Sequence, residues 1–207
     1  NNNNNNNVDK PKISLFGDGF LNKAKVETVK SAKTKRKEVV LPPGITEREI
    51  FSKYKIESKN RIGEGTFARV KIVTNKKTGH KYALKMVRKK GKSKGDIRAV
   101  KNEILYLLKL NNHPNIIKLY DYCETSEGLY MVIEYCNGGE LFNILTEQNQ
   151  RGYKEKEALD ITRQIALGLS YAHKNKVVHR DMKCENLMFN NNIVKIIDFG
   201  LGGDLQF

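Results

Sequence analysis

The stretch that decides the fold is His179-Arg180-Asp181-Met182-Lys183-Cys184-Glu185-Asn186, followed twelve residues after Asn186 by Asp198-Phe199-Gly200. Between these motifs, residues 187–189 and the apolar run 193–197 flank an Asn-rich turn, a pattern that predicts two short antiparallel strands joined by a tight loop. In such a hairpin Asn186 and Asp198 meet at the neck. A carboxylate facing an amide oxygen is a hard-oxygen site, so this neck predicts a Mg²⁺ site.

Asp181 and Lys183 lie two residues apart on the loop that precedes the hairpin. A carboxylate here can orient a hydroxyl group and accept its proton, while a neighbouring ammonium can neutralise charge on a transferring phosphoryl group. Taken singly, His-Arg-Asp and Asp-Phe-Gly are weak signals, because Asp and Gly are common turn residues. Their order and spacing together form a specific signal.

Together the two motifs resemble the catalytic loop and the metal-binding motif of eukaryotic protein kinases. Lys183, at a position where tyrosine kinases carry Ala or Arg, indicates the serine/threonine type. The resemblance implies that ATP and Mg²⁺ are cofactors, that a protein hydroxyl is the acceptor, that Asp181 and Lys183 are catalytic and that Asn186 and Asp198 hold the metal. It also implies an α+β, bilobal fold, with a five-stranded antiparallel small lobe containing one large helix and a mainly helical large lobe.

Upstream, apolar and polar residues alternate over residues 54–62, 68–74 and 81–88, which predicts three antiparallel strands. Gly63 and Gly65 lack a β-carbon, so their backbone N–H groups can approach phosphate oxygens. Alone, this is an ordinary glycine-containing hairpin. It matches the kinase glycine-rich loop except that Ala68 replaces the third glycine. The nucleotide contacts implied along this loop are Ile62, Gly63, Glu64, Gly65, Thr66, Phe67, Ala68, Arg69 and Val70.

Lys85 lies in the third strand, where an inward-pointing lysine is costly unless an anion pairs with it. Asp96 can cap a following helix, whose apolar stripe is Ile97, Val100, Ile104, Leu107 and Leu108. Glu103 lies on this stripe and is the natural partner of Lys85; the alternative is two unrelated solvated charges. In the kinase resemblance the lysine contacts the α- and β-phosphates and the glutamate holds it.

Residues 116–123 and 129–134 predict the fourth and fifth strands, and the glycines after Cys136 end the pattern at a hinge. By resemblance, the Glu134 carbonyl and the Cys136 backbone meet the adenine edge, and Ile133 limits the depth of the pocket. Val70, Ala83 and Met188 form its apolar walls. Met188 is leucine in many kinases, a change of little volume that alters inhibitor shape preference.

Beyond the hinge, residues 140–148 and 156–174 predict helices, the second with an apolar face formed by Ala158, Ile161, Ile165, Leu169 and Ala172. Asn137-Gly138-Gly139-Glu140-Leu141-Phe142 resembles the calcium/calmodulin-dependent kinase group, in which this glutamate contacts ribose or a basic substrate residue. The alternative role of Glu140 is electrostatic, at a helix end.

The formal net charge of +15 is concentrated in residues 66–95, which contain no acidic residue. Since neither aromatic interleaving nor a nucleic-acid motif accompanies the lysines, we interpret them as a solvated face that attracts nucleotide, and not as a nucleic-acid surface.

Three scattered cysteines predict neither disulfides nor a zinc site. With no apolar run that could span a bilayer, we expect no membrane contact and a cytoplasmic or nuclear location.

Residues 1–53 combine an Asn homopolymer, a basic run and Pro42-Pro43-Gly44, which predicts a disordered extension. Its lysine cluster at 33–37 is compatible with a solvated linker or a nuclear-import patch. We therefore expect residues 54–207 to hold the kinase domain, with a small lobe over 54–135 and a large lobe over 136–207.

The resemblance covers residues 54–200, whereas the activation segment and later large-lobe helices are not in the 207 residues. We therefore expect a C-terminally incomplete domain, with an exposed helix face that a partner covers. Stacked side chains that link the lobes are implied at Leu107, Leu119, His179 and Phe199. The alternative to an active kinase is a catalytically inactive, nucleotide- or partner-binding protein.

Overall fold

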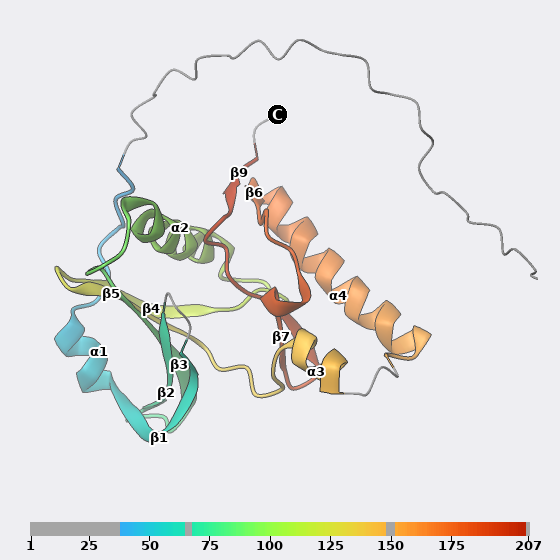
Figure 1. The fold of residues 1–207 in the computed structure, drawn as a ribbon, viewed down its shortest axis with the longest axis horizontal. Coiled ribbons are helices and arrows are strands. Elements are labelled where there is room, and N and C mark those ends of the chain that lie inside the picture. The colour runs from blue at the N-terminus through green and yellow to red at the C-terminus, as the bar shows by residue number, and fades with distance from the viewer. Residues whose placement is uncertain (1–37, 65–67, 148–151, 206–207) are drawn as a thin grey trace, which may run out of the picture. The chain divides into compact units, whose positions relative to one another are not determined.

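The computed structural model describes residues 38–64, 68–147 and 152–205 (Figure 1). Five strands form one sheet in the order β1-β2-β3-β5-β4, and each neighbouring pair is antiparallel. This confirms the predicted small-lobe sheet. The strands are β1 (Tyr54–Glu64), β2 (Arg69–Asn75), β3 (Lys81–Arg88), β4 (Leu119–Glu124) and β5 (Gly128–Glu134).

Helix α2 (Lys94–Leu110) packs on one face of this sheet, where Ile104, Leu107 and Leu110 join Leu129 and Met131 of β5 in the larger hydrophobic core. The predicted cap is corrected: Ser93 is the N-cap, and Asp96 is the third helical residue of a capping box. Leu108, predicted on the buried stripe, is exposed, and Leu110 is buried instead.

The second face of the sheet is covered by helix α1 (Glu47–Lys53), which lies inside the segment predicted to be a disordered extension. That prediction is wrong for residues 38–53. Ile50 is fully buried among Val73, Leu84 and Val132, and a Thr46–Glu49 capping box starts the helix. The burial of one apolar side chain and the cap stabilise a helix too short to persist alone.

The segment before α1 runs along the edge of the sheet. The Ile45 amide donates to the Tyr122 carbonyl at 3.1 Å, and the Tyr122 hydroxyl donates to the Pro42 carbonyl at 2.8 Å. Leu41 packs against the larger hydrophobic core. These contacts order the Pro42-Pro43-Gly44 stretch without regular structure. The other part of the predicted extension, residues 1–37, lies outside the described residues.

Beyond the hinge the chain folds into helices and two-stranded sheets (Figure 1). Strands β7 and β8 pair antiparallel, as predicted, and β6 pairs with β9. The elements are α3 (Leu141–Glu147), α4 (Glu155–Lys174), β6 (Val177–Val178), a 3₁₀ turn (Cys184–Asn186), β7 (Leu187–Asn190), β8 (Ile193–Ile196) and β9 (Gly203–Asp204).

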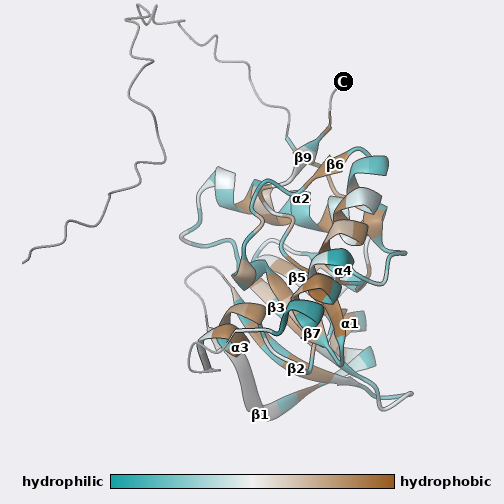
Figure 2. Ribbon diagram, turned by 90° about the vertical axis from the view of Figure 1, so that its right-hand side faces the viewer, coloured by the Kyte–Doolittle hydropathy of each residue, from teal (hydrophilic) through white to brown (hydrophobic). Residues whose placement is uncertain are grey.

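Helix α4 has one side on the core and one side open, and Figure 2 shows both hydrophobic and hydrophilic stretches along it. Ala172 is buried and Ile161, Ile165 and Leu169 are partly buried, whereas Ala158, predicted on the same face, is exposed. Elsewhere on the helix Leu159 is 68% and Leu167 is 48% exposed. Among the described residues no helix has the length and apolar content that crossing a membrane requires.

Candidate active site

A lysine and a glutamate from different elements meet between the sheet and α2. Lys85 Nζ lies 2.8 Å and 2.7 Å from the two carboxylate oxygens of Glu103. The side chains are 18% and 5% exposed, respectively. Burial opposes the charged form of Lys85, but the carboxylates of Glu103 and Asp198 outweigh it and raise the pKa of Lys85. The predicted pair therefore forms, with the lysine charged and Asp198 close enough to act on it.

Asp198 is positioned by the buried residue that follows it. Phe199 is fully buried, and its ring contacts the His179 ring edge-on at a centroid distance of 4.6 Å. Leu107 and Leu119 belong to the same hydrophobic core, so the four residues expected to link the lobes are all buried. Asp198 itself has a φ of +59°, an uncommon conformation for a residue with a side chain. The burial of Phe199 fixes the backbone that presents the Asp198 carboxylate.

His179 connects the catalytic loop to the strand before Asp198. The Asp181 amide donates to His179 Nδ1 at 3.2 Å, so the imidazole proton resides on Nε2 and is donated to the Ile197 carbonyl at 2.8 Å. Because His179 is 1% exposed, these bonds are sheltered from water. They couple the backbone at Asp181 to the backbone beside Asp198.

The catalytic loop brings Asp181, Lys183 and Asn186 together as predicted. Lys183 Nζ lies 3.0 Å from Asp181 Oδ2, and Asn186 Nδ2 donates to the carbonyl of Asp181 at 2.7 Å and to Oδ2 at 3.0 Å. The hydrogen bond from Lys183, with that from Asn186, holds the pKa of Asp181 below its ordinary value. Asp181 is therefore an ionised carboxylate with a fixed orientation.

The predicted metal ligands lie at the neck of the β7–β8 hairpin. The Ile197 amide donates to the Asn186 carbonyl at 3.0 Å. Asp198 follows Ile197 directly, so it lies close to Asn186. Because the Asn186 amide nitrogen is bonded to Asp181, its side-chain oxygen is the atom left to face a cation. Over the described ranges no group of three His, Cys, Asp or Glu side chains gathers. One carboxylate and one amide fit Mg²⁺, which needs few protein ligands.

The predicted adenine walls share the face of the sheet that carries Lys85. Val70 is paired with Lys85, and Ala83 is paired with Ile133, so all four side chains point to the same side. Met188 lies in β7 and bridges to Glu140 through the backbone. Glu134 and Cys136 follow at the end of β5, with Cys136 buried. The structure thus places Val70, Ala83 and Ile133 on the face that carries Lys85, and it places Met188 beside the segment that follows the hinge.

The glycine-rich loop is described in part. Gly63 is paired with Val70 and Glu64 with Arg69 at the end of the β1–β2 ladder, and Ile62 precedes them in β1. Gly65, Thr66 and Phe67 lie outside the described residues. Ala68 lines a cavity on the other side of the sheet.

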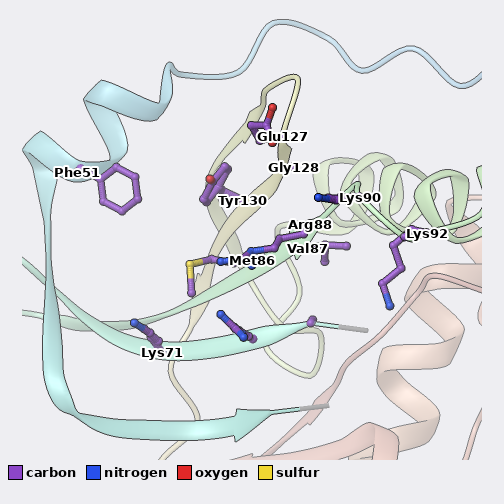
Figure 3. A pocket seen from close by; sticks show the side chains of 13 residues that line it. Phe51, Lys71, Met86, Val87, Arg88, Lys90, Lys92, Glu127, Gly128 and Tyr130 are labelled. Carbon is purple, nitrogen blue, oxygen red and sulfur yellow. The ribbon is translucent and has the colours of Figure 1, made fainter. Parts of the chain in front are cut away.

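Arg69 does not lie near Lys85. It is paired with Met86, and Met86 points to the opposite face of the sheet from its neighbour Lys85. There a cavity of about 760 Å³ lies between the sheet and α1 (Figure 3). Aromatic side chains of α1 and β5 and basic side chains of β2, β3 and the following loop line it. Among them are Phe51, Lys71, Met86, Arg88, Lys90 and Tyr130, together with Ala68 and Arg69.

A set of hinge contacts was not foreseen in the sequence. Lys195 Nζ lies 2.8 Å from Glu134 Oε1, and Asn190 Nδ2 donates to the same oxygen at 2.7 Å. The Gly138 amide donates to the Phe189 carbonyl at 2.8 Å, and the Phe189 amide donates to the Gly139 carbonyl at 2.9 Å. One feature of the sequence points to this contact. Lys195 lies within the apolar run 193–197, and a lysine in a buried strand needs an anionic partner.

Comparison with known proteins agrees with this geometry. The model of the protein kinase domain matches residues 56–206. The SNF1-like protein kinase ssp2 of Schizosaccharomyces pombe is 43% identical over 164 residues, which are 78% of this chain and 27% of the relative. The carbon catabolite-derepressing protein kinase of Saccharomyces cerevisiae is 43% identical over 142 residues, 68% of this chain and 22% of the relative. Rice serine/threonine protein kinase OSK3 is 40% identical over 141 residues, 68% of this chain and 27% of the relative.

The chain thus spans about a quarter of the length of the curated relatives it matches. The matched region contains the Lys85–Glu103 pair, the catalytic loop and the Asp198 motif. The chain belongs to the protein kinase domain family.

Proposed function

We propose that the protein is a serine/threonine protein kinase that transfers the γ-phosphoryl group of ATP to protein hydroxyls. The observation that carries this proposal is the network of Asp181, Lys183 and Asn186 beside Asp198. It combines an oriented, ionised carboxylate with a cation and two oxygen ligands within one loop and hairpin. Phosphoryl transfer depends on such positioning and electrostatic stabilisation.

In the proposed reaction the acceptor hydroxyl oxygen forms a bond to the γ-phosphorus as the bond to the β–γ bridging oxygen breaks. ADP leaves, and the hydroxyl proton passes to the Asp181 carboxylate. Lys183 stabilises the negative charge on the transferring group, and Lys85 holds the α- and β-phosphates. Asn186 and Asp198 would hold Mg²⁺, which would neutralise phosphate charge.

The finer assignments belong to the same proposal. Membership of the calcium/calmodulin-dependent group rests on residues 137–142, and a cytoplasmic or nuclear location rests on three free cysteines. The open side of α4, with Leu159 and Leu167 exposed, supports further polypeptide covering this helix. That cover would complete the platform that holds the acceptor peptide.

The test is transfer of radiolabelled phosphate to a serine peptide. We compare the 207-residue chain, the same chain continued with the large lobe of a related kinase, and an Asp181→Asn variant of each. We expect Asp181-dependent transfer by the continued chain and negligible transfer by the 207 residues, since misplacing the acceptor by about 1 Å costs ~10²-fold in rate. A folded, continued chain that binds nucleotide without transferring phosphate would favour an inactive nucleotide-binding protein.

A further inference from the structure

Lys195 is a buried lysine that the proposed reaction does not use. The residue is 7% exposed, and its ammonium forms an ion pair with Glu134, whose side chain is 14% exposed. A buried charge is costly unless it is paired and hydrogen-bonded. The fold therefore holds a sheltered ion pair between Lys195 of β8 and Glu134, the last residue of β5. The hinge begins at Glu134.

Glu134 is held from three segments of the chain. Its Oε1 accepts hydrogen bonds from Lys195 and Asn190 at 2.8 Å and 2.7 Å. Its Oε2 accepts from the Lys118 amide at 3.3 Å, and its own backbone amide donates to the Lys118 carbonyl at 2.8 Å. Both the side chain and the backbone of Glu134 are therefore fixed.

The residues that hold Glu134 share a face of the hairpin with Met188. Met188 is paired with Lys195 across the β7–β8 ladder, and Asn190 lies two residues beyond Met188 on the same strand. Opposite residues in an antiparallel ladder, and alternate residues in a strand, point to the same side. One side of this hairpin thus carries both the predicted adenine wall and the polar groups that bind the hinge.

We propose that Lys195 and Asn190 are positioning residues for nucleotide recognition, because they fix Glu134 and with it the orientation of the hinge backbone that meets adenine. This inference rests on the proposed kinase function. When the tether is removed, the hinge populates other orientations, and the affinity for nucleotide falls by the fraction of molecules that are no longer competent to bind.

The first test needs no nucleotide. Cys136 lies two residues beyond Glu134 and is buried, and burial, reinforced by Glu134 and opposed by Lys195, raises the pKa of its thiol to about 12. Cys123 is a second buried thiol, in β4, and serves as an internal control. We expect Lys195→Met to speed iodoacetamide labelling of Cys136 about tenfold and to leave Cys123 unchanged, because the lost contact is a charged hydrogen bond local to the hinge. Loss of the Lys195 charge alone raises the pKa of the Cys136 thiol and slows labelling, so a faster rate reports opening of the hinge. Labelling is read site by site by mass spectrometry.

The second test measures recognition. Titration with a fluorescent ATP analogue and Mg²⁺ should give about tenfold weaker binding for Lys195→Met. In the continued chain the KM for ATP rises by the same factor, whereas kcat at saturating ATP stays within about twofold, because bound nucleotide restores the hinge. The matched control is Lys156→Met, which removes an exposed lysine at the start of α4.

A double variant separates positioning from stability. Lys195→Met alone leaves the buried Glu134 carboxylate without its cation and should lower thermal stability, whereas Glu134→Gln with Lys195→Met removes both buried charges, so the stability should recover while the affinity stays weak. Full recovery of affinity together with stability would overturn the proposal, and so would wild-type labelling of Cys136 in Lys195→Met. If the unchanged chain binds no nucleotide, the proposed function fails instead, and the labelling rates alone decide whether Lys195 holds the hinge.

Discussion

Replacing Lys85 by Met separates the structural and functional roles of the Lys85–Glu103 pair. The substitution leaves a carboxylate whose side chain is 5% exposed without its cation. Breaking a buried ion pair from one side costs about 3–5 kcal/mol, and since Lys85 keeps 18% exposure we expect the lower end, about 3 kcal/mol. For a domain of this size each kcal/mol lowers Tm by about 2–4 °C, which gives a loss of about 6–12 °C.

The loss should shrink as the pH falls. Burial raises the pKa of Glu103, and Lys85 opposes that rise in the unchanged protein. Without Lys85 the folded form binds a proton at higher pH than the unfolded chain does. Folding of the variant is therefore stabilised as the pH falls through the raised pKa of Glu103, and its Tm deficit decreases.

The double variant Lys85→Met with Glu103→Leu provides the control. An apolar pair of similar size often replaces a buried ion pair without loss, so most of the stability should return. ATP affinity should not return, because the phosphates have lost their cation. Circular dichroism melts and titrations with labelled ATP measure the two quantities. Equal Tm values for the single and double variants, or full ATP affinity in the double variant, would refute the reasoning.

Three further predictions concern the metal, the carboxylate and the first helix. Asp198→Asn should abolish the dependence of nucleotide affinity on Mg²⁺, measured by titrations with and without the metal; a retained dependence contradicts the assignment. Because Lys183 holds the pKa of Asp181 low, Lys183→Met should move the acidic limit of kcat/KM in the continued chain to higher pH, and an unmoved limit argues against this coupling. Thr46→Ala should lower the free energy of unfolding by about 1 kcal/mol in denaturant melts, whereas the exposed Arg48→Ala should not; equal effects would exclude the cap.

The elements near the motifs could be predicted from sequence because their signals are local. The alternation around Lys85 and the turn between β7 and β8 follow short-range chemistry: β3 has the predicted bounds, and those of β7 and β8 each differ from expectation by one residue. Strand β4 is the exception: it was expected from residue 116 and begins at Leu119. Ile116 instead forms an isolated parallel bridge to Ile196. These residues are far apart in the sequence, so no local pattern predicts their pairing.

Helix α1 was missed because composition outweighed a short signal. Thr46 and Glu49 form the spacing of a capping box, and Ile50 follows as an apolar residue, but Pro42-Pro43-Gly44 and the preceding lysines favour an extension. What decides the fold here is the hydrophobic face that β2, β3 and β5 offer to Ile50, and this face exists only after the sheet forms. The contact between Lys195 and Glu134 could not be predicted either, because it too depends on the folded arrangement: 61 residues separate the partners.

The strand order β1-β2-β3-β5-β4 also governs how the lobe can assemble. The ladders β1–β2–β3 and β4–β5 join neighbours in the chain, whereas β3–β5 pairing must enclose α2 and the segment around it. Closing this longer loop costs more chain entropy, so the β3–β5 ladder forms more slowly than the local ladders. Lys85 pairs with Met131 in the β3–β5 ladder. Lys85 is already held in the local β2–β3 ladder by its pairing with Val70, whereas the hinge after β5 comes beside it only when β3 and β5 pair, so the predicted nucleotide site is complete only after this ladder has closed.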